Sequence, residues 1–163
     1  MDEKWVQIFV NGARDYFGEI SDTPAKVGSS YLSESIASDL MDYTGIIGIS
    51  GLCRGRLYFS APSTMLRHLL LTLGEVSVDA AYLADMAGEA ANTLSGNSRR
   101  ELGCDFVISP PTVIEGVPTG EQLPRSLRSL VIPIIWHKYR ASLVLSVEST
   151  HEFVAANGAE RGF

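Results

Sequence analysis

The stretch TGIIGISGLCRGRLYFS, residues 44–60, decides the predicted fold because it has the pattern of two β-strands joined by a tight turn. Its first half, Thr44 to Gly51, is rich in β-branched residues and punctuated by glycines, which favours a strand. Arg54 to Ser60 also has strand character, and the intervening glycines predict a turn near Gly51 to Gly55. Strands joined by so short a turn pair antiparallel.

Two helices are predicted directly after this hairpin. Pro62 stands at the first-turn position of the first one, where its missing N–H is harmless, and Gly74 ends it. The apolar face of this helix consists of Met65, Leu66, Leu69, Leu70 and Leu73. The second helix is the longest, from Ser77 as its N-cap to about Leu102, with Gly103 as its stop.

Four strand-like runs follow the long helix. They cover Cys104–Ser109, Thr112–Glu115, Leu127–Trp136 and Tyr139–Val147. The last two are separated by His137-Lys138, which predicts a second hairpin. Pro133 inside the third run predicts a sheet edge or a bulge, because proline cannot donate to a strand ladder.

The segment before the first hairpin predicts one more helix. Apolar residues at helical spacing place it at roughly Lys4 to Phe17, with Gly18 as its C-cap. A short strand is expected near Lys26 to Leu32. Residues 149–163 are weakly patterned and predict a short helix around Glu152 to Ala156 and a frayed tail. The expected fold is therefore one α+β domain, residues 1–163, with helices packed on a largely antiparallel sheet.

Composition narrows the class of protein. The chain has 163 residues, of which 45% are hydrophobic, and this is enough for one core. Its net charge of −6 argues against nucleic acid as a partner, because phosphate binding needs a basic patch. Cys53 and Cys104 are far apart and predict reduced, buried thiols. The start MDEKWVQIF is no signal peptide and no run is long enough to cross a membrane, so we expect a cytoplasmic protein.

The longest predicted helix presents one polar stripe. At about 100° per residue, five positions fall within a stripe about 80° wide. They are Asp85, Glu89, Asn92, Gly96 and Arg99. The opposite side carries small or apolar residues, namely Leu83, Ala87, Ala90, Ala91 and Leu94. Ser98 and Glu101 break this pattern, so we expect the last turn to fray or project.

Two residues of the stripe distinguish it from an ordinary solvated face. Asn92 is unfavourable inside a helix because its side chain competes for backbone hydrogen bonds. Gly96 costs about 1 kcal/mol relative to alanine, and it leaves the surface beside Asn92 open. Together they indicate a surface that another molecule approaches, although acid-rich exposed stripes are also common as plain solvated surface.

The motif Asp85-x-x-x-Glu89-x-x-Asn92, within DMAGEAANTLSGNSRREL at residues 85–102, resembles the signature of the CheC/CheX/FliY family. Members of that family are phosphatases of the chemotaxis response regulator CheY, and the short single-domain form is most similar to CheX. Residues 44–60, ISPPTVIEG at 108–116 and SLVIPIIWHKYRASLVLSVE at 129–148 also match in character. The resemblance covers roughly Thr44 to Glu148.

The resemblance implies a mechanism and a set of partners. Asn92 would insert its amide into the active site of a phosphorylated CheY-like response regulator and hold the attacking water in line. Glu89 would pair with a lysine of that protein, and Asp85, Gly96 and Arg99 would belong to the docking surface. Mg²⁺ would be bound by the response regulator, with no cofactor on this chain. The chain would form a homodimer through its sheet.

Some relatives carry a second copy of the motif on the first helix. Asn11 stands at the asparagine position here, but Ile8 replaces the glutamate, so one site per chain is expected. Two rival functions remain open: a non-catalytic module that binds a response regulator, and a sensing or scaffold domain in which the stripe is only solvated. His68 has no second ligand nearby in the sequence, which favours a packed or surface residue over a metal ligand.

Overall fold

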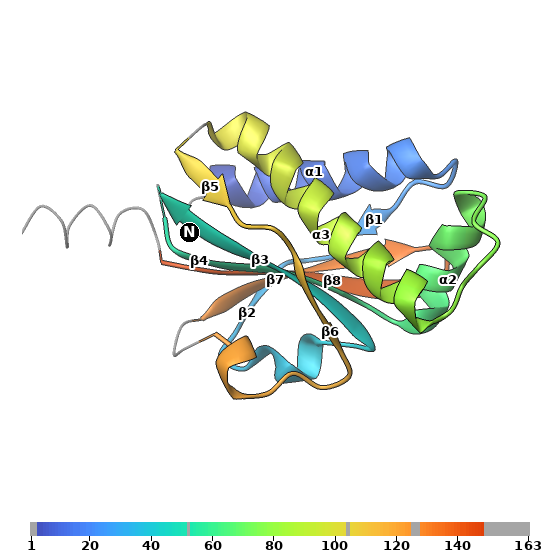
Figure 1. Cartoon of the computed structure of the whole chain (residues 1–163). Helices are drawn as coiled ribbons and strands as arrows, with labels where there is room; N and C mark the ends of the chain where they lie inside the picture. The colour runs from blue at the N-terminus through green and yellow to red at the C-terminus, as the bar shows by residue number, and fades with distance from the viewer. Residues whose placement is uncertain (1–2, 52, 104, 125–127, 149–163) are drawn as a thin grey trace, which may run out of the picture.

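The computed structural model describes residues 3–51, 53–103, 105–124 and 128–148 of the chain. These residues form one eight-stranded sheet, and three helices cover one of its faces (Figure 1). In chain order the elements are α1 (Glu3–Ile20), β1 (Lys26–Val27), β2 (Tyr31–Ser33), the 3-10 turn η1 (Ile36–Asp39), β3 (Tyr43–Gly51), β4 (Gly55–Ala61), α2 (Ser63–Thr72), α3 (Ala80–Leu102), β5 (Phe106–Ile108), β6 (Thr112–Glu115), the 3-10 turn η2 (Gly120–Gln122), β7 (Ser129–Trp136) and β8 (Tyr139–Val147). The predicted α+β class, with helices on an antiparallel sheet, is confirmed.

The first predicted hairpin is confirmed, and it lies in the interior of the sheet. Strands β3 and β4 pair antiparallel with Ile47 opposite Leu57, and the strand order is β1-β7-β8-β4-β3-β5. Strands β5 and β6 pair with different parts of the same edge of β3, and β4 pairs with its other edge, so β3 has partners on both sides. Because β3 is interior, it gives α3 a fixed surface on which to pack.

The second predicted hairpin is also confirmed, with β7 paired to β8 across a turn at His137. His137 has a φ of 52°, the left-handed conformation that tight turns require. Pro133 lies within β7, which pairs with β8 on one side and with β1 and β2 on the other. The pairing on the second side is interrupted at Pro133. There Gly28 donates its N–H to the carbonyl of Pro133 at 2.9 Å.

The predicted strand at residues 26–32 is two short strands instead of one. Strand β1 pairs with β7 beyond Pro133 and β2 pairs with β7 before it. Proline has no N–H to continue the ladder, so the pairing strand is interrupted opposite it. The prediction that Pro133 marks a sheet edge is wrong, because β7 is an interior strand whose register with β8 is continuous through Pro133. The expectation of one continuous strand at residues 26–32 is also wrong.

The first helix is longer than predicted. It continues to Ile20, and the expected C-cap Gly18 lies inside it. Gly18 has no positive φ, so its backbone stays helical. Gly12 is buried where α1 meets α3. A Cβ at this position would lie 3.6 Å from Oγ of Ser98 in α3. Glycines inside a helix weaken it without ending it, which explains the misplaced boundary.

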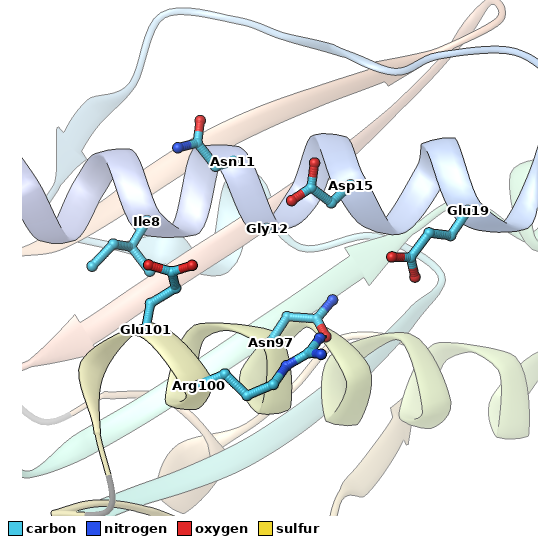
Figure 2. A pocket seen from close by; sticks show the side chains of 8 residues that line it. All are labelled: Ile8, Asn11, Gly12, Asp15, Glu19, Asn97, Arg100 and Glu101. Atoms are coloured by element: carbon cyan, nitrogen blue, oxygen red, sulfur yellow. The ribbon is translucent and has the colours of Figure 1, made fainter.

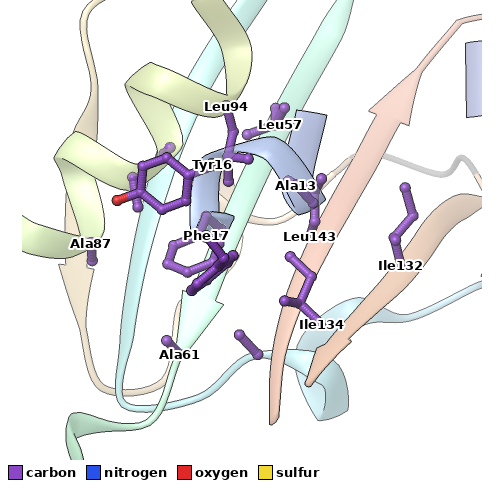
Figure 3. Packing of buried hydrophobic residues seen from close by; sticks show 14 of the residues in the cluster. Ala13, Tyr16, Phe17, Leu57, Ala61, Ala87, Leu94, Ile132, Ile134 and Leu143 are labelled. Atoms are coloured by element: carbon purple, nitrogen blue, oxygen red, sulfur yellow. The ribbon is translucent and has the colours of Figure 1, made fainter. Parts of the chain in front are cut away.

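The main core lies between the sheet and the helices. Figure 3 shows part of it, in which α1 contributes Ala13, Tyr16 and Phe17 against sheet residues such as Leu57 and Leu143. A smaller cluster of Ile36, Tyr58, Val131 and Val144 lies on the opposite face, under the 3-10 turns. Both layers bury apolar surface, which is the main stabilising contribution to such a domain.

The described helices include none with the length and apolar character needed to cross a bilayer. The predictions for Cys104, for the helix at Glu152 to Ala156 and for the tail lie outside the described residues.

Candidate active site

Helix α3 carries the predicted polar stripe, and its first residue differs from the prediction. The N-cap is Asp79, whose carboxylate accepts a hydrogen bond from the backbone N–H of Tyr82 at 3.2 Å. The expected cap Ser77 lies two residues earlier, outside the helix. Both residue types are good caps, and a carboxylate has the added benefit of facing the positive end of the helix dipole. The predicted end is confirmed, with Gly103 as C-cap at φ 99°.

The buried face of α3 matches the prediction. Leu83, Ala87, Ala90, Ala91 and Leu94 are all buried. Small residues let the helix lie almost on the sheet, since a Cβ on Gly45 of β3 would lie 2.5 Å from the carbonyl oxygen of Ala87. Gly88 packs as closely against β6, because a Cβ there would lie 2.9 Å from Cγ2 of Val113. The helix is therefore held tightly from two sides.

The expectation that the last turn of α3 frays is wrong. Ser98 falls on the core side and is buried, but its hydroxyl donates to the backbone carbonyl of Leu94 at 2.9 Å. Ser95 does the same with Ala91 at 2.8 Å. A serine that bonds back to its own helix can be buried without an unsatisfied group. Glu101 lies exposed at the rim of a groove.

The predicted stripe faces outward along α3. Asp85, Glu89, Asn92 and Arg99 are exposed, and Gly96 is half-buried. Glu89 and Asn92 are three residues apart, so their side chains emerge about one turn from each other on the same face. Among the residues that the structure describes, no hydrogen-bond or ion-pair partner occupies the side chains of Asp85, Glu89 or Asn92. Their polar groups are free to meet another molecule.

The far end of the stripe borders a small hollow. Gly96 and Arg99 line it together with Arg100, Gly103 and Ile108. A Cβ added to Gly96 would meet nothing within 4 Å. Packing among the described residues therefore gives no reason for glycine at position 96.

A polar groove of about 360 Å³ runs between α1 and α3, beside the stripe (Figure 2). Helix α1 contributes Ile8, Asn11, Gly12, Asp15 and Glu19, and α3 contributes Asn97, Arg100 and Glu101. In it Arg100 donates to the side-chain oxygen of Asn97. The sequence did not predict this groove, because it depends on two segments about 85 residues apart lying side by side.

The two residues that correspond to a second motif copy lie on the α1 side of this groove. The side-chain oxygen of Asn11 accepts a hydrogen bond from Nε2 of Gln7 at 2.8 Å, one turn earlier in the same helix. Ile8 is half-buried at the groove and supplies no charge. A single site per chain remains a prediction.

The charge of one stripe residue affects the pKa of a buried tyrosine in α1. Tyr16 of α1 is 3% exposed, and burial raises the pKa of its phenol well above the usual range. The negative charge of Glu89 raises the pKa of Tyr16 further. The Tyr16 phenol therefore keeps its proton, and the charge of Glu89 contributes to this.

Other reactive groups lie away from the stripe. Cys53 is fully buried, and burial raises the pKa of its thiol from 9.0 to about 11, which disfavours the nucleophilic thiolate. His68 shares a hydrogen bond of 3.2 Å with the hydroxyl of Tyr139 and stacks on His137. Within the described ranges, no group of three or more His, Cys, Asp or Glu side chains is placed to hold a metal ion.

The chain matches a family model described as chemotaxis phosphatase CheX over residues 43–135. These residues run from β3 through α3 into β7 and contain the whole stripe. No curated protein matches the chain in sequence.

Several crystal structures share its fold at low sequence identity. A CheC-like superfamily protein from Shewanella sp. PV-4 has a TM-score of 0.77 and 19% identity, over 91% of this chain and 100% of that chain. CheX from Vibrio vulnificus has a TM-score of 0.73 and 18% identity, over 89% and 99%. The CheX–CheY–BeF3–Mg²⁺ complex from Borrelia burgdorferi has a TM-score of 0.70 and 18% identity, over 89% and 98%.

Proposed function

The chain belongs to the CheX family of chemotaxis phosphatases, and we propose that it hydrolyses the aspartyl-phosphate of a CheY-type response regulator. The observation that carries this proposal is the exposed pair Glu89 and Asn92, without partners in the described structure, on a helix packed closely against β3 and β6. The Borrelia burgdorferi complex supports the choice of partner, because a protein of the same fold is bound there to CheY.

Asn92 is the proposed catalytic residue. A side-chain amide can accept from a water molecule and donate to it at the same time. Placed beside the phosphoryl group, it holds that water in line with the bond that breaks. The water oxygen bonds to phosphorus as the acyl-phosphate P–O bond breaks, which yields inorganic phosphate and the free aspartate. No covalent intermediate on this chain is required.

Glu89 is the proposed docking residue, one turn before Asn92. Its carboxylate would pair with a lysine of the response regulator, which orients the two proteins so that Asn92 reaches the phosphoryl group. Asp85, Gly96 and Arg99 extend the same surface toward both ends of α3. Mg²⁺ would arrive bound to the response regulator.

The test is phosphate release from a phosphorylated CheY-type receiver of the same cell. Asn92→Ala should lower turnover by about 10²–10³-fold, the usual effect of losing one transition-state contact. The substitution should not unfold the protein, because position 92 is exposed and alanine favours helix more than asparagine does. Glu89→Ala should reduce both binding and turnover.

Asn97→Ala is the matched control, since it removes the same amide from the same helix on the side that faces α1. It should release phosphate at the wild-type rate. Wild-type turnover in Asn92→Ala would refute the mechanism. Binding of the receiver without acceleration by the wild-type protein would favour the alternative, a non-catalytic docking module.

We also propose a homodimer joined through a sheet edge. The edge formed by β1 and β2 exposes two large apolar side chains, Leu32 at 61% and Tyr31 at 38%. Unpaired edges are templates for another strand, and apolar residues on them favour association.

A further inference from the structure

The polar stripe of α3 continues into an aromatic residue at the start of the helix. Tyr82 lies three residues before Asp85 and seven before Glu89. At about 100° per residue it projects within about 20° of Glu89, so it shares the outward face of the stripe. Tyr82 is 42% exposed and lies in the first turn of α3. The outward face therefore begins with an apolar ring and ends with Arg99.

The fold itself gives little reason for a tyrosine at this position. Val78 and Leu83, which flank the first turn, both pack in the main core, so the start of the helix is anchored without Tyr82. Among the described residues, the hydroxyl of Tyr82 has no hydrogen-bond partner and its ring stacks on no other aromatic ring. Tyrosine is also a poorer helix former than alanine. A contact outside the chain would explain the residue.

Other exposed apolar side chains gather at the same end of the molecule. Helices α2 and α3 pack against each other, and the segment between them enters α3 at its first turn (Figure 1). Leu71, Leu73 and Val76 lie at the end of α2 and in this segment, and Val76 is 97% exposed. With Tyr82 they are four of the nine large apolar side chains exposed in the described parts of the chain, so exposed apolar surface concentrates here.

The size of a protein–protein contact brings Tyr82 within reach of the proposed partner. At 1.5 Å per residue, Tyr82 and Arg99 are about 26 Å apart along the helix axis. A standard interface buries about 800 Å² on each partner, which corresponds to a patch roughly 30 Å across. A response regulator centred on Glu89 and Asn92 therefore covers Tyr82. The distance from Tyr82 to Asn92 is about 15 Å along the axis, too far for the ring to touch the reacting phosphoryl group.

Building on the proposed function, we propose that Tyr82 is the apolar anchor of the docking surface and packs on an apolar side chain of the response regulator. That side chain would lie about 10 Å from the lysine that Glu89 contacts, since Tyr82 and Glu89 are two helical turns apart. Tyrosine is enriched among the residues that dominate binding energy, because its ring covers much area and loses little freedom. The stripe thus selects a receiver by two surface features, a lysine and an apolar residue at this spacing.

The binding test is Tyr82→Ala, titrated by calorimetry with a CheY-type receiver of the same cell that carries beryllofluoride and Mg²⁺. The dissociation constant should rise about tenfold, as for other interface anchors. KM for the phosphorylated receiver should rise equally, with kcat within about twofold of wild type, because the ring does not reach the phosphoryl group. An unchanged dissociation constant in Tyr82→Ala would overturn the inference.

Two further measurements identify the contact as apolar. Tyr82→Phe should stay within about threefold of wild-type affinity, because the ring remains. The loss in Tyr82→Ala should be the same at low and high salt, whereas the loss in Glu89→Ala should shrink as salt screens the ion pair. A loss in Tyr82→Phe as large as in Tyr82→Ala, or a Tyr82 effect that disappears at high salt, would overturn the inference.

Val117→Ala is the control for loss of an exposed apolar side chain. Val117 lies between β6 and η2, and η2 is on the face of the sheet opposite to α3 (Figure 1). This variant should bind the receiver as the wild type does. Circular dichroism of Tyr82→Ala checks that its helices are intact. A loss of affinity in Val117→Ala equal to that in Tyr82→Ala would overturn the inference.

The same measurements separate this inference from the proposed function. Binding without hydrolysis by the wild type, weakened in Tyr82→Ala, would support the anchor and refute the phosphatase. Hydrolysis by the wild type, with unchanged affinity and KM in Tyr82→Ala, would support the phosphatase and refute the anchor. If Tyr82→Ala instead dissociates a dimer in sedimentation velocity, a second copy of this chain covers the ring, and the inference is overturned.

Discussion

Helix α3 contains two glycines, at positions 88 and 96, and they are there for different reasons. A Cβ on Gly88 would lie 2.9 Å from Val113, so the packing of α3 on β6 requires its absence. At Gly96, in contrast, a Cβ would meet no atom of the described residues within 4 Å. Each glycine costs the helix about 1 kcal/mol relative to alanine. Since packing explains only Gly88, close approach of a partner is the reason we assign to Gly96.

Gly96→Ala should therefore raise stability and reduce function. We expect the free energy of unfolding to increase by about 0.5–1 kcal/mol in urea titrations, because alanine is the better helix former. KM for the phosphorylated receiver should rise at the same time. Gly18→Ala is the control: Gly18 is also helical and its Cβ would also meet open space, but it lies on α1. A gain in stability with unchanged KM in both variants would remove Gly96 from the docking surface.

At the scale of the element, α3 combines a tightly packed inner face with an outer stripe in which Asp85, Glu89 and Asn92 have no hydrogen-bond partner among the described residues. Gly45 in β3 and Gly88 in the helix itself let α3 approach β3 and β6 closely. The carboxylate of Asp79 caps its first turn, and Gly103 ends it. A catalytic amide must be held at a defined position to orient water, and packing of this kind provides that rigidity.

The capping assignment leads to a prediction of its own. Asp79→Ala should lower the free energy of unfolding by about 1 kcal/mol, because the N–H of Tyr82 loses its acceptor. Ser77→Ala should leave stability within about 0.5 kcal/mol of wild type, since Ser77 lies outside the helix. Urea titration of the two variants side by side measures the difference. A larger loss for Ser77→Ala would restore the cap predicted from the sequence.

At the scale of the whole molecule, the sheet has two edges and the proposed site lies near one of them. Helix α3 lies over β3 and against β5 and β6, at the end of the strand order opposite to β1. A dimer through the β1 and β2 edge would therefore leave both copies of the stripe open to response regulators.

Leu32→Asp should convert the proposed dimer into a monomer, because it places a charge where the apolar edge would be covered. Sedimentation velocity over a range of concentrations measures the change. Val107→Asp, at an exposed apolar position of 44% on β5, is the control on the opposite edge and should remain dimeric. If Val107→Asp dissociates and Leu32→Asp does not, the interface lies at the β5 edge, and a monomeric wild type would refute the dimer.

The sequence alone determined the elements that depend on local pattern. Both hairpins, the buried Ala and Leu face of α3 and its outward stripe follow from periods of two and 3.6 residues, which any stretch of chain expresses by itself. The motif of Glu89 and Asn92 also lies within one helix, so its shared face was predictable. Helix starts were less so, because Ser77 and Asp79 are both good caps, and Gly18 does not end a helix that packing continues.

Only the tertiary structure decided what lies behind and beside the stripe. Residues of α1 and α3 about 85 positions apart form the groove, and no periodicity encodes such a distant pairing. In the sequence Tyr16 is one more apolar position of an amphipathic helix. Its burial and the raised pKa of its phenol arise only once the core is assembled, because burial and neighbouring charge are properties of the core and not of the local chain.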